Sequence, residues 1–436
     1  MKKAGERRME IRRQDNIRNL LADITLPRMV KVRQRFDRSG IGDVAGTLRQ
    51  KLDSAGIASR IRPGMSVALT GSGREIANMN IILRETASFL RDRGALPFIV
   101  PAMGSHGSST AEGQKEILSG YGITEEFCGC PVRSSMDTVL LGHTADGDPV
   151  YLDTFAHRAD AIVAVGRIKP HTAFRGKYES GLMKMLAVGL GKQKGADSIH
   201  RLGFGPLKDR IPAFASVVME KHRVLFGVGV IENAFKETCR LEVLRGEEIP
   251  EKEPALLEYA KTRMAAILFP EADVLVVRTI GKNYSGSGMD PNISGTWATP
   301  FGGGGIRKQR TVVLDLDDKS HGNSLGAGMA DFTTLRLFRK IDFTALYPNG
   351  LTSTVIEPCK IPMVLENDEM AIRAAVKTCT GIDRNKVRMV MIRNTQELET
   401  ILVSEPLAGG GNLPEGAEIL GGAEEMSFDR DGNLSE

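Results

Sequence analysis

The sequence of 436 residues contains no apolar run of the roughly 18 residues that a membrane-spanning helix requires. Its first residues are charged where a secretory signal peptide needs an apolar core. These absences argue against a membrane protein and a secreted protein, so we expect a cytoplasmic location and no membrane partner. Cysteine is also scarce, with five residues, of which Cys128 and Cys130 are too close for the usual disulfide. We therefore expect no disulfide framework and no zinc site built from CxxC pairs.

Charge of one sign is not in large excess either, because the formal net charge is only +4. The two ends nevertheless differ: residues 1–18 hold seven Lys/Arg, whereas residues 404–436 hold eight acids and one arginine. A basic arm can bind nucleic acid, but this one lacks interleaved aromatic residues and any nucleic-acid motif. We interpret it as a solvated terminus and expect no nucleic-acid partner.

Glycine, by contrast, is abundant, with 48 residues in a chain whose apolar share (41%) and charged share (26%) are those of a globular protein. A chain of this length is expected to form two domains or more. Glycine-rich turns between apolar runs are therefore the places to search for binding sites.

The clearest local pattern is a βαβ unit between residues 62 and 104. An apolar run at 66–70 precedes a Gly-Ser-Gly turn, a helical segment at 78–93 and a second apolar run at 97–101. Continuous Val/Ile/Leu runs of this kind suit parallel strands that are covered on both faces. Similar runs occur at 161–165, 224–230, 274–277, 311–316 and 387–392. The sequence thus predicts an α/β protein with two α/β domains, mainly parallel sheets and a cleft between the domains.

The predicted domain boundary lies near residues 265–272, after a helical segment and before a new strand. This gives a catalytic domain at 1–268 and a second α/β domain at 269–405. Residues 406–436 form an acidic, glycine-rich tail that packs back onto the first domain in one interpretation.

Two histidines follow two of the predicted strands. His106 comes after the strand that ends near Pro101, and His171 comes after the strand at 161–165. Ligands of open α/β sheets collect at the carboxyl ends of strands, and imidazole titrates near neutral pH, so the pair is a candidate acid and base. The alternative for each histidine is a loop residue satisfied by backbone hydrogen bonds.

Lys184 lies in an apolar, glycine-bearing stretch, where burial would lower its pKa and make the amine a better nucleophile. His200 follows sixteen residues later and is a candidate metal ligand. The alternatives are an exposed lysine on a half-buried helix and a surface histidine.

Three glycine-rich segments remain. Gly71, Ser72 and Gly73, followed by Arg74, can present backbone N–H groups and a guanidinium to a phosphate or carboxylate. The segment 281–292 follows the first strand of the second domain and is a candidate for the opposite wall of the cleft. We interpret the segment 301–305 as a flexible connection.

In its set of His106, His171, Lys184 and His200, the chain resembles the nickel-dependent lactate racemase family, most closely between residues 67 and 200. The resemblance implies a nickel pincer nucleotide joined covalently to Lys184, with His200 as a nickel ligand. It also implies that His106 and His171 exchange the hydroxyl proton of a 2-hydroxy acid and that Arg74 holds its carboxylate. The implied partners are that small acid and the enzymes that build the cofactor.

Two features depart from the family pattern. The spacing from His171 to Lys184 is longer by a few residues, and the added loop contains Lys177, a candidate substrate-binding residue. In the second domain, the family's Tyr-Gln pair and lysine are replaced by Ser294, Gly295 and Ala298. Each lost charged hydrogen bond costs about 1.5–3 kcal/mol, so lactate should bind poorly. The small residues favour a larger 2-hydroxy acid, with Lys177, Lys282 and Arg307 as replacement donors.

The predicted function is therefore racemisation or epimerisation of a 2-hydroxy acid other than lactate. Two alternatives stay open. One is a non-catalytic relative that binds a carboxylate or a nucleotide. The other is a nicotinamide-dependent dehydrogenase, although the Gly71-Ser72-Gly73 turn lacks the third glycine of a GxGxxG fingerprint.

Overall fold

The computed structural model describes residues 15–409, 411 and 413–435. Most of the basic segment 1–18 therefore lies outside the described residues. In the described part of the chain, no helix is both long and apolar enough to cross a membrane.

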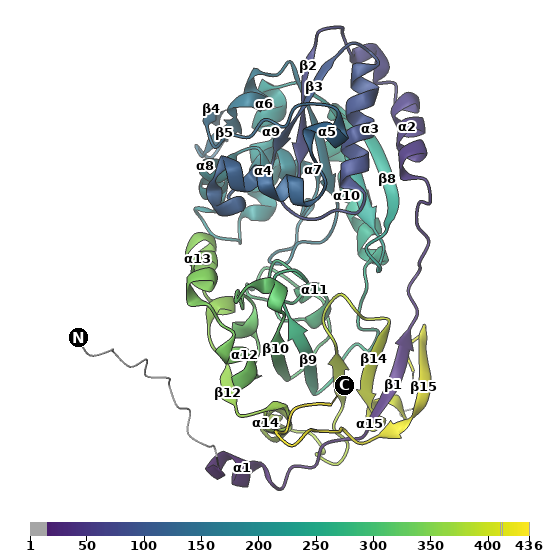
Figure 1. The fold of residues 1–436 in the computed structure, drawn as a ribbon, viewed down its shortest axis with the longest axis vertical. Helices are drawn as coiled ribbons and strands as arrows, with labels where there is room; N and C mark the ends of the chain where they lie inside the picture. The colour runs from purple at the N-terminus through teal and green to yellow at the C-terminus, as the bar shows by residue number, and fades with distance from the viewer. Residues whose placement is uncertain (1–14, 410, 412, 436) are drawn as a thin grey trace, which may run out of the picture. The chain divides into compact units, whose positions relative to one another are not determined.

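The described chain divides into two compact units (Figure 1). Unit 2 contains residues 36–265 together with the short segment 299–303. Unit 1 contains the residues before 36, the residues 266–298 and the residues from 304 onward. The change of unit at 266 falls at the predicted boundary, but the ranges differ from the prediction because the N-terminal strand belongs to unit 1.

Unit 2 is built on a five-stranded sheet with the order β3-β2-β6-β7-β8. The first four strands pair in parallel, and β8 pairs with β7 in the antiparallel sense. A separate hairpin joins β4 to β5. The strands are β2 (Ser66–Gly71), β3 (Leu96–Pro101), β4 (Thr138–His143), β5 (Pro149–Asp153), β6 (Ala161–Arg167), β7 (Val224–Glu232) and β8 (Thr238–Arg245). The helices are α2 (Val44–Ser54), α3 (Met79–Arg91), α4 (Ala111–Gly120), α5 (Glu125–Cys128), α6 (Thr154–Arg158), α7 (Leu182–Lys184), α8 (Lys192–His200), α9 (Leu207–Lys221) and α10 (Ile249–Arg263).

Alternation along the strands divides the core of unit 2 between the two faces of the sheet. Val163 and Val165 of β6 pack with α2 and α3, whereas Ile162 and Ala164 pack with α7, α9 and α10. Both sets are fully buried, as continuous apolar strands require. The predicted βαβ unit and the predicted strands at 161–165 and 224–230 are confirmed.

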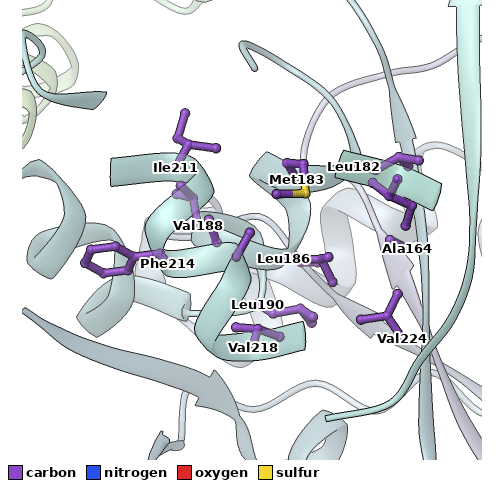
Figure 2. Close-up of a cluster of buried hydrophobic side chains, with 14 of the residues drawn as sticks. Ala164, Leu182, Met183, Leu186, Val188, Leu190, Ile211, Phe214, Val218 and Val224 are labelled. Carbon is purple, nitrogen blue, oxygen red and sulfur yellow. The ribbon is translucent and has the colours of Figure 1, made fainter. Parts of the chain in front are cut away.

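The second of these core clusters supports the segment that carries Lys184. Figure 2 shows Leu186 and Val188 of this segment beside Ile211, Phe214 and Val218 of α9. Phe214 is 1% exposed, so the Lys184 segment rests on a closely packed apolar layer.

Unit 1 is built on an eight-stranded sheet with the order β12-β11-β10-β9-β13-β14-β1-β15. The strands from β12 to β13 pair in parallel, and the remaining pairs are antiparallel. The strands are β1 (Met29–Gln34), β9 (Val274–Ile280), β10 (Arg310–Leu316), β11 (Phe332–Thr334), β12 (Met363–Leu365), β13 (Met389–Ile392), β14 (Thr400–Ser404) and β15 (Ala417–Glu424). The helices are α1 (Asp15–Leu21), α11 (Pro291–Ser294), α12 (Leu335–Arg339), α13 (Phe343–Ser353), α14 (Asp368–Thr378) and α15 (Glu405–Ala408).

Both ends of the chain complete the sheet of unit 1. In Figure 1, the purple strand β1 lies between the yellow-green β14 and the yellow β15. The strand β15 of the acidic tail pairs with β1 over Met29–Gln34, which lies within the predicted first domain (1–268) but belongs to unit 1 of the structure. Edge pairing satisfies the backbone groups of β1, and Glu418 adds ion pairs with Arg33 and Arg35.

Candidate active site

The candidate site residues of unit 2 follow three neighbouring strands. The Gly71–Arg74 turn follows β2, His106 follows β3, and His171 follows β6, with β2 between the other two strands. Since these strands are parallel, the three loops leave the same edge of the sheet. The predicted placement of both histidines at carboxyl ends is therefore confirmed.

The turn after β2 lies directly against the His106 loop. A Cβ atom added to Gly73 would lie 2.5 Å from Cβ of Met103 and 3.2 Å from Cγ of His106. Glycine is needed here because of this close approach. The backbone N–H of Arg74 donates to Oγ of Ser72 at 3.3 Å, and the Arg74 side chain is exposed.

The ring of His106 has a defined proton position. Its Nδ1 lies 2.6 Å from the carbonyl oxygen of Met103. A carbonyl only accepts hydrogen bonds, so Nδ1 carries the proton of the neutral ring and the lone pair lies on Nε2. This is the state of a ring that can take up a proton at Nε2.

The ring of His171 has the opposite state. The backbone N–H of Ala173 donates to its Nδ1 at 3.1 Å, so the neutral ring carries its proton on Nε2. Burial lowers the pKa of His171 well below its ordinary value, and the neighbouring charges of Lys184 and His200 lower it further. At neutral pH this ring is therefore neutral and offers an N–H group.

The loop that carries His171 is braced by a buried carboxylate. Glu179 accepts hydrogen bonds from the backbone N–H of His171 at 2.6 Å and from Nη1 of Arg175 at 3.0 Å. Arg175 also donates to the carbonyl oxygens of His171 (2.9 Å) and Gly303 (2.8 Å from Nη2). The segment 299–303 is thereby fastened to this loop, so our interpretation of 301–305 as a flexible connection is wrong for residues 301–303.

Lys184 ends α7 and is followed by a π-helical turn at Met185–Gly189. Single π-helical turns frequently occur at functional sites. Burial lowers the pKa of the Lys184 amine to about 8, and the positive charges of Arg74 and Lys169 act in the same direction. A far larger fraction of this amine is therefore unprotonated near neutral pH than in a solvated lysine.

His200 is the last residue of α8. Its Nδ1 donates to the carbonyl oxygen of Ala196 at 2.7 Å, which leaves the lone pair on Nε2. Metal-binding histidines in proteins commonly have this arrangement. The centre of the Phe204 ring lies 5.5 Å from the centre of the His200 ring and 6.5 Å from that of the His171 ring. The same aromatic side chain therefore lies near both histidines.

Lys177 is less closely connected. It is exposed, and its Nζ lies 5.3 Å from the centre of the Tyr178 ring, whose hydroxyl donates to the carbonyl oxygen of Pro250 at 2.5 Å. Within the described residues, no hydrogen bond or ion pair joins it to Lys184 or to either candidate acid–base histidine. Its role in substrate binding stays a prediction.

Two of the three replacements in unit 1, Ser294 and Gly295, do not create the expected space. Ser294 is fully buried, and its hydroxyl donates to the carbonyl oxygen of Asp290 at 3.1 Å. Gly295 has φ +65°, and an added Cβ would lie 2.3 Å from the carbonyl oxygen of Ile306. Both small residues are therefore explained by the turn itself.

The two donors proposed from unit 1 lie at different ends of its sheet. Lys282 follows the carboxyl end of β9 and donates to Oδ1 of Asn349. Arg307 forms an ion pair of 3.1 Å with Glu271, which precedes the amino end of β9. The position of Arg307 therefore does not match that of a donor at the carboxyl ends of the strands.

Sequence reasoning did not single out Glu253, a buried carboxylate on α10. Its Oε2 accepts from the backbone N–H of Met183 at 2.9 Å, so it caps the short helix that carries Lys184. A Cβ on Gly181 would overlap its Oε1. The signal in the sequence was weak, because Glu253 stands in a run of acids and lysines that is typical of a solvated helix.

Glu253 gives a testable pH dependence of stability. Burial raises its pKa from 4.5 to about 7, which corresponds to roughly 3 kcal/mol. The folded protein binds this proton more tightly than the unfolded chain, so the stabilisation is complete below pH 4.5 and is lost as the pH rises through 7. We expect Glu253→Gln to gain roughly 3 kcal/mol of unfolding free energy relative to wild type between pH 4 and pH 8 in urea titrations.

Glu85 provides the matched control for this experiment. It is also buried, but Arg49 and Arg84 outweigh the effect of burial and lower its pKa. Glu85→Gln should therefore lose stability relative to wild type as the pH rises. An equal response of both variants to pH would contradict the assignment for Glu253.

Residues 38–206 match the family described as "Lactate racemase N-terminal domain". The matched segment contains every candidate site residue of unit 2 named from the sequence, from Gly71 to His200. The predicted resemblance is therefore confirmed for this segment.

Among solved structures, the chain is similar to the lactate racemase apoprotein from Thermoanaerobacterium thermosaccharolyticum. The two share 13% identity, the match covers 84% of this chain and 94% of that one, and the TM-score is 0.49. Among proteins with curated functions, none matches the chain significantly. The proposals below rest on the side chains of unit 2 and on the family match.

Proposed function

We propose that the protein is a racemase or epimerase of a 2-hydroxy acid. One observation carries the proposal: within the segment that matches the lactate racemase N-terminal domain family, His106 and His171 have opposite ring states, and the charge of Lys184, an amine of lowered pKa, acts on His171. Racemisation needs the hydroxyl proton to be removed and then returned to the same oxygen, with that oxygen held in place between the two steps.

The residues of this chain fit a nickel pincer nucleotide. The Lys184 amine is the site of covalent attachment, and its lowered pKa favours the reactive, unprotonated form. His200 supplies Nε2 to the metal while its Nδ1–H is held by Ala196. When bound at these residues, such a cofactor would supply reversible hydride chemistry at the substrate Cα.

The other side chains then handle the proton and the carboxylate. His106 takes the hydroxyl proton at Nε2 and becomes the imidazolium that later returns it, while the neutral Nε2–H of His171 donates a hydrogen bond that holds the substrate oxygen. Arg74, exposed at the end of the turn after β2, pairs with the carboxylate. The substrate class is a 2-hydroxy acid other than lactate, because the polar residues expected to hold lactate are replaced in the second half of the chain.

The test is co-expression of the full chain with the enzymes that build the cofactor. Intact mass and nickel content are measured first, and the expected result is one nucleotide-sized adduct and about one nickel per chain. The loaded protein is then incubated with single enantiomers of lactate, malate, tartrate and gluconate and analysed by chiral chromatography. Racemisation or epimerisation in D₂O without deuterium entering Cα supports internal hydride return, whereas deuterium at Cα contradicts it.

Two other outcomes would favour the alternatives. A loaded protein that converts none of these acids would indicate a binding protein. A protein without adduct that reduces NAD⁺ in the presence of one of these acids would indicate a dehydrogenase.

A further inference from the structure

Lys192 has an unusual position between the candidate cofactor residues. It is the first residue of α8, which ends at His200. It follows the π-helical turn at Met185–Gly189, which comes directly after Lys184. Its side chain is 0% exposed, although lysine is almost never fully buried. Its φ is +54°, in the left-handed region that non-glycine residues avoid. A buried charge at a strained backbone position costs free energy, so the surroundings must hold it in place.

The amine of Lys192 joins three other elements. Nζ donates to the carbonyl oxygen of Pro101 at the end of β3 (2.6 Å) and to Oε1 of Gln114 on α4 (3.1 Å). It also forms an ion pair of 3.2 Å with the fully buried Asp153, which caps α6 through its other oxygen. An apolar side chain of the same length would fill this space but would make none of these bonds.

Gln114 extends the network to the His106 loop. Its Nε2 donates to the carbonyl oxygens of Gly104 (2.8 Å) and His106 (3.2 Å). The backbone N–H of Gly104 donates in turn to the carbonyl oxygen of Gly189, in the turn after Lys184. The loop is thus held from one side by Lys192 through Gln114 and from the other by the Lys184 segment itself.

We propose that Lys192 is a positioning residue that fixes the His106 loop against the element carrying Lys184 and His200. The roles of these three residues rest on the proposed function, but the mechanical link itself does not. Lys192 holds the end of β3 through Pro101 and the residues 104–106 through Gln114. The His106 ring therefore keeps its contact with Met103 and its lone pair on Nε2.

The test measures amide hydrogen exchange of the full chain without cofactor. Lys192→Met alone would leave Asp153 as an unpaired buried charge and endanger folding, so the main variant is Lys192→Met/Asp153→Asn. We expect exchange in the peptide 102–110 to rise at least about tenfold while exchange in β2 and β7 stays within about twofold. Gln114→Leu, which leaves the Lys192–Asp153 pair intact, should loosen the same peptide.

A second buried ion pair of unit 2 supplies the control. Arg210 pairs with Asp148 at 2.5 Å and donates to the carbonyl oxygens of Ser198 and Ile199. Arg210→Met/Asp148→Asn should therefore raise exchange near 198–200 and leave 102–110 unchanged. An equal rise of amide exchange throughout unit 2 in both double variants would overturn the positioning role. Unchanged exchange at 102–110 in Lys192→Met/Asp153→Asn and in Gln114→Leu would overturn it as well.

A spectroscopic readout separates positioning from general stability. In ¹⁵N-histidine-labelled protein, the ring of His106 should show its proton on Nδ1 in the wild type and a mixture of tautomers in the Lys192→Met/Asp153→Asn variant. An unchanged tautomer in a variant that is folded also overturns the proposal. Because these measurements need no cofactor, a wild-type protein that fails to load or to turn over would contradict the proposed function and leave this result standing.

Discussion

Replacing Lys184 by alanine is expected to abolish the nucleotide adduct and the bound nickel completely after co-expression with the cofactor-building enzymes. The amine is the attachment point in the proposed function, and its pKa of about 8 makes it the reactive nucleophile of this segment. Lys184→Arg should fail in the same way, because a guanidinium keeps the charge but is not deprotonated near neutral pH. Intact mass and nickel analysis of the purified variants give the answer directly.

The control for this prediction is Lys194→Ala, an exposed lysine on α8 ten residues away in the sequence. It should retain one adduct per chain. The thermal unfolding of Lys184→Ala should stay close to that of wild type, because the substitution removes a cation that burial already disfavours. An adduct on Lys184→Ala, or an adduct of wild type that maps to another residue, would remove the proposed attachment site.

The second large effect concerns the two histidines. His106→Gln and His171→Gln should each lower kcat/KM by about 10²–10⁴-fold, the usual contribution of a positioned acid or base. The double variant should be hardly slower than either single variant, because both histidines act on the same substrate oxygen and the effects of groups that act as a unit are not additive. Rates of racemisation or epimerisation of the loaded enzyme measure this.

The ring states predict a result that needs no turnover. In labelled protein at neutral pH, His106 should carry its proton on Nδ1 and His171 on Nε2, as their contacts with Met103 and Ala173 require. A control is His143 on β4, an exposed residue of the separate hairpin, whose replacement by glutamine should leave kcat/KM unchanged. Identical tautomers in His106 and His171, or one histidine whose loss is without effect, would contradict the assignment of opposite roles.

The strands β2, β3, β6, β7, β9 and β10 were predictable, because parallel strands covered on both faces appear as continuous apolar runs. The strands β1, β14 and β15 were not predicted. Their side chains are partly exposed, and β1 pairs with β14 and β15, which lie hundreds of residues away, so local patterning contains little of the information even though β14 also pairs with the nearby β13.

The residues of the candidate site also divide into those that the sequence indicates and those that only the structure reveals. His106 and His171 are recognisable in the sequence because each follows a strand, and Lys184 because it lies in an apolar, glycine-bearing stretch, whereas His200 is singled out only together with these three. Lys192, Glu179 and Glu253 resemble ordinary surface charges in the sequence, since burial of a lysine or a carboxylate depends on which distant elements cover it. The small residues Ser294 and Gly295 suggested space, whereas the fold assigns them to a closely packed turn.

The sequence by itself determined the α/β class, the strand–turn–helix unit around Gly71–Arg74 and the order of His106, His171, Lys184 and His200. These features depend on local periodicity and on residue types at short spacing. Only the tertiary structure decided which ring nitrogen of each histidine carries the proton, which charges are buried and where the ends of the chain pair. Those properties are set by contacts between residues far apart in the sequence, because hydrogen bonding, desolvation and edge pairing arise when distant segments meet.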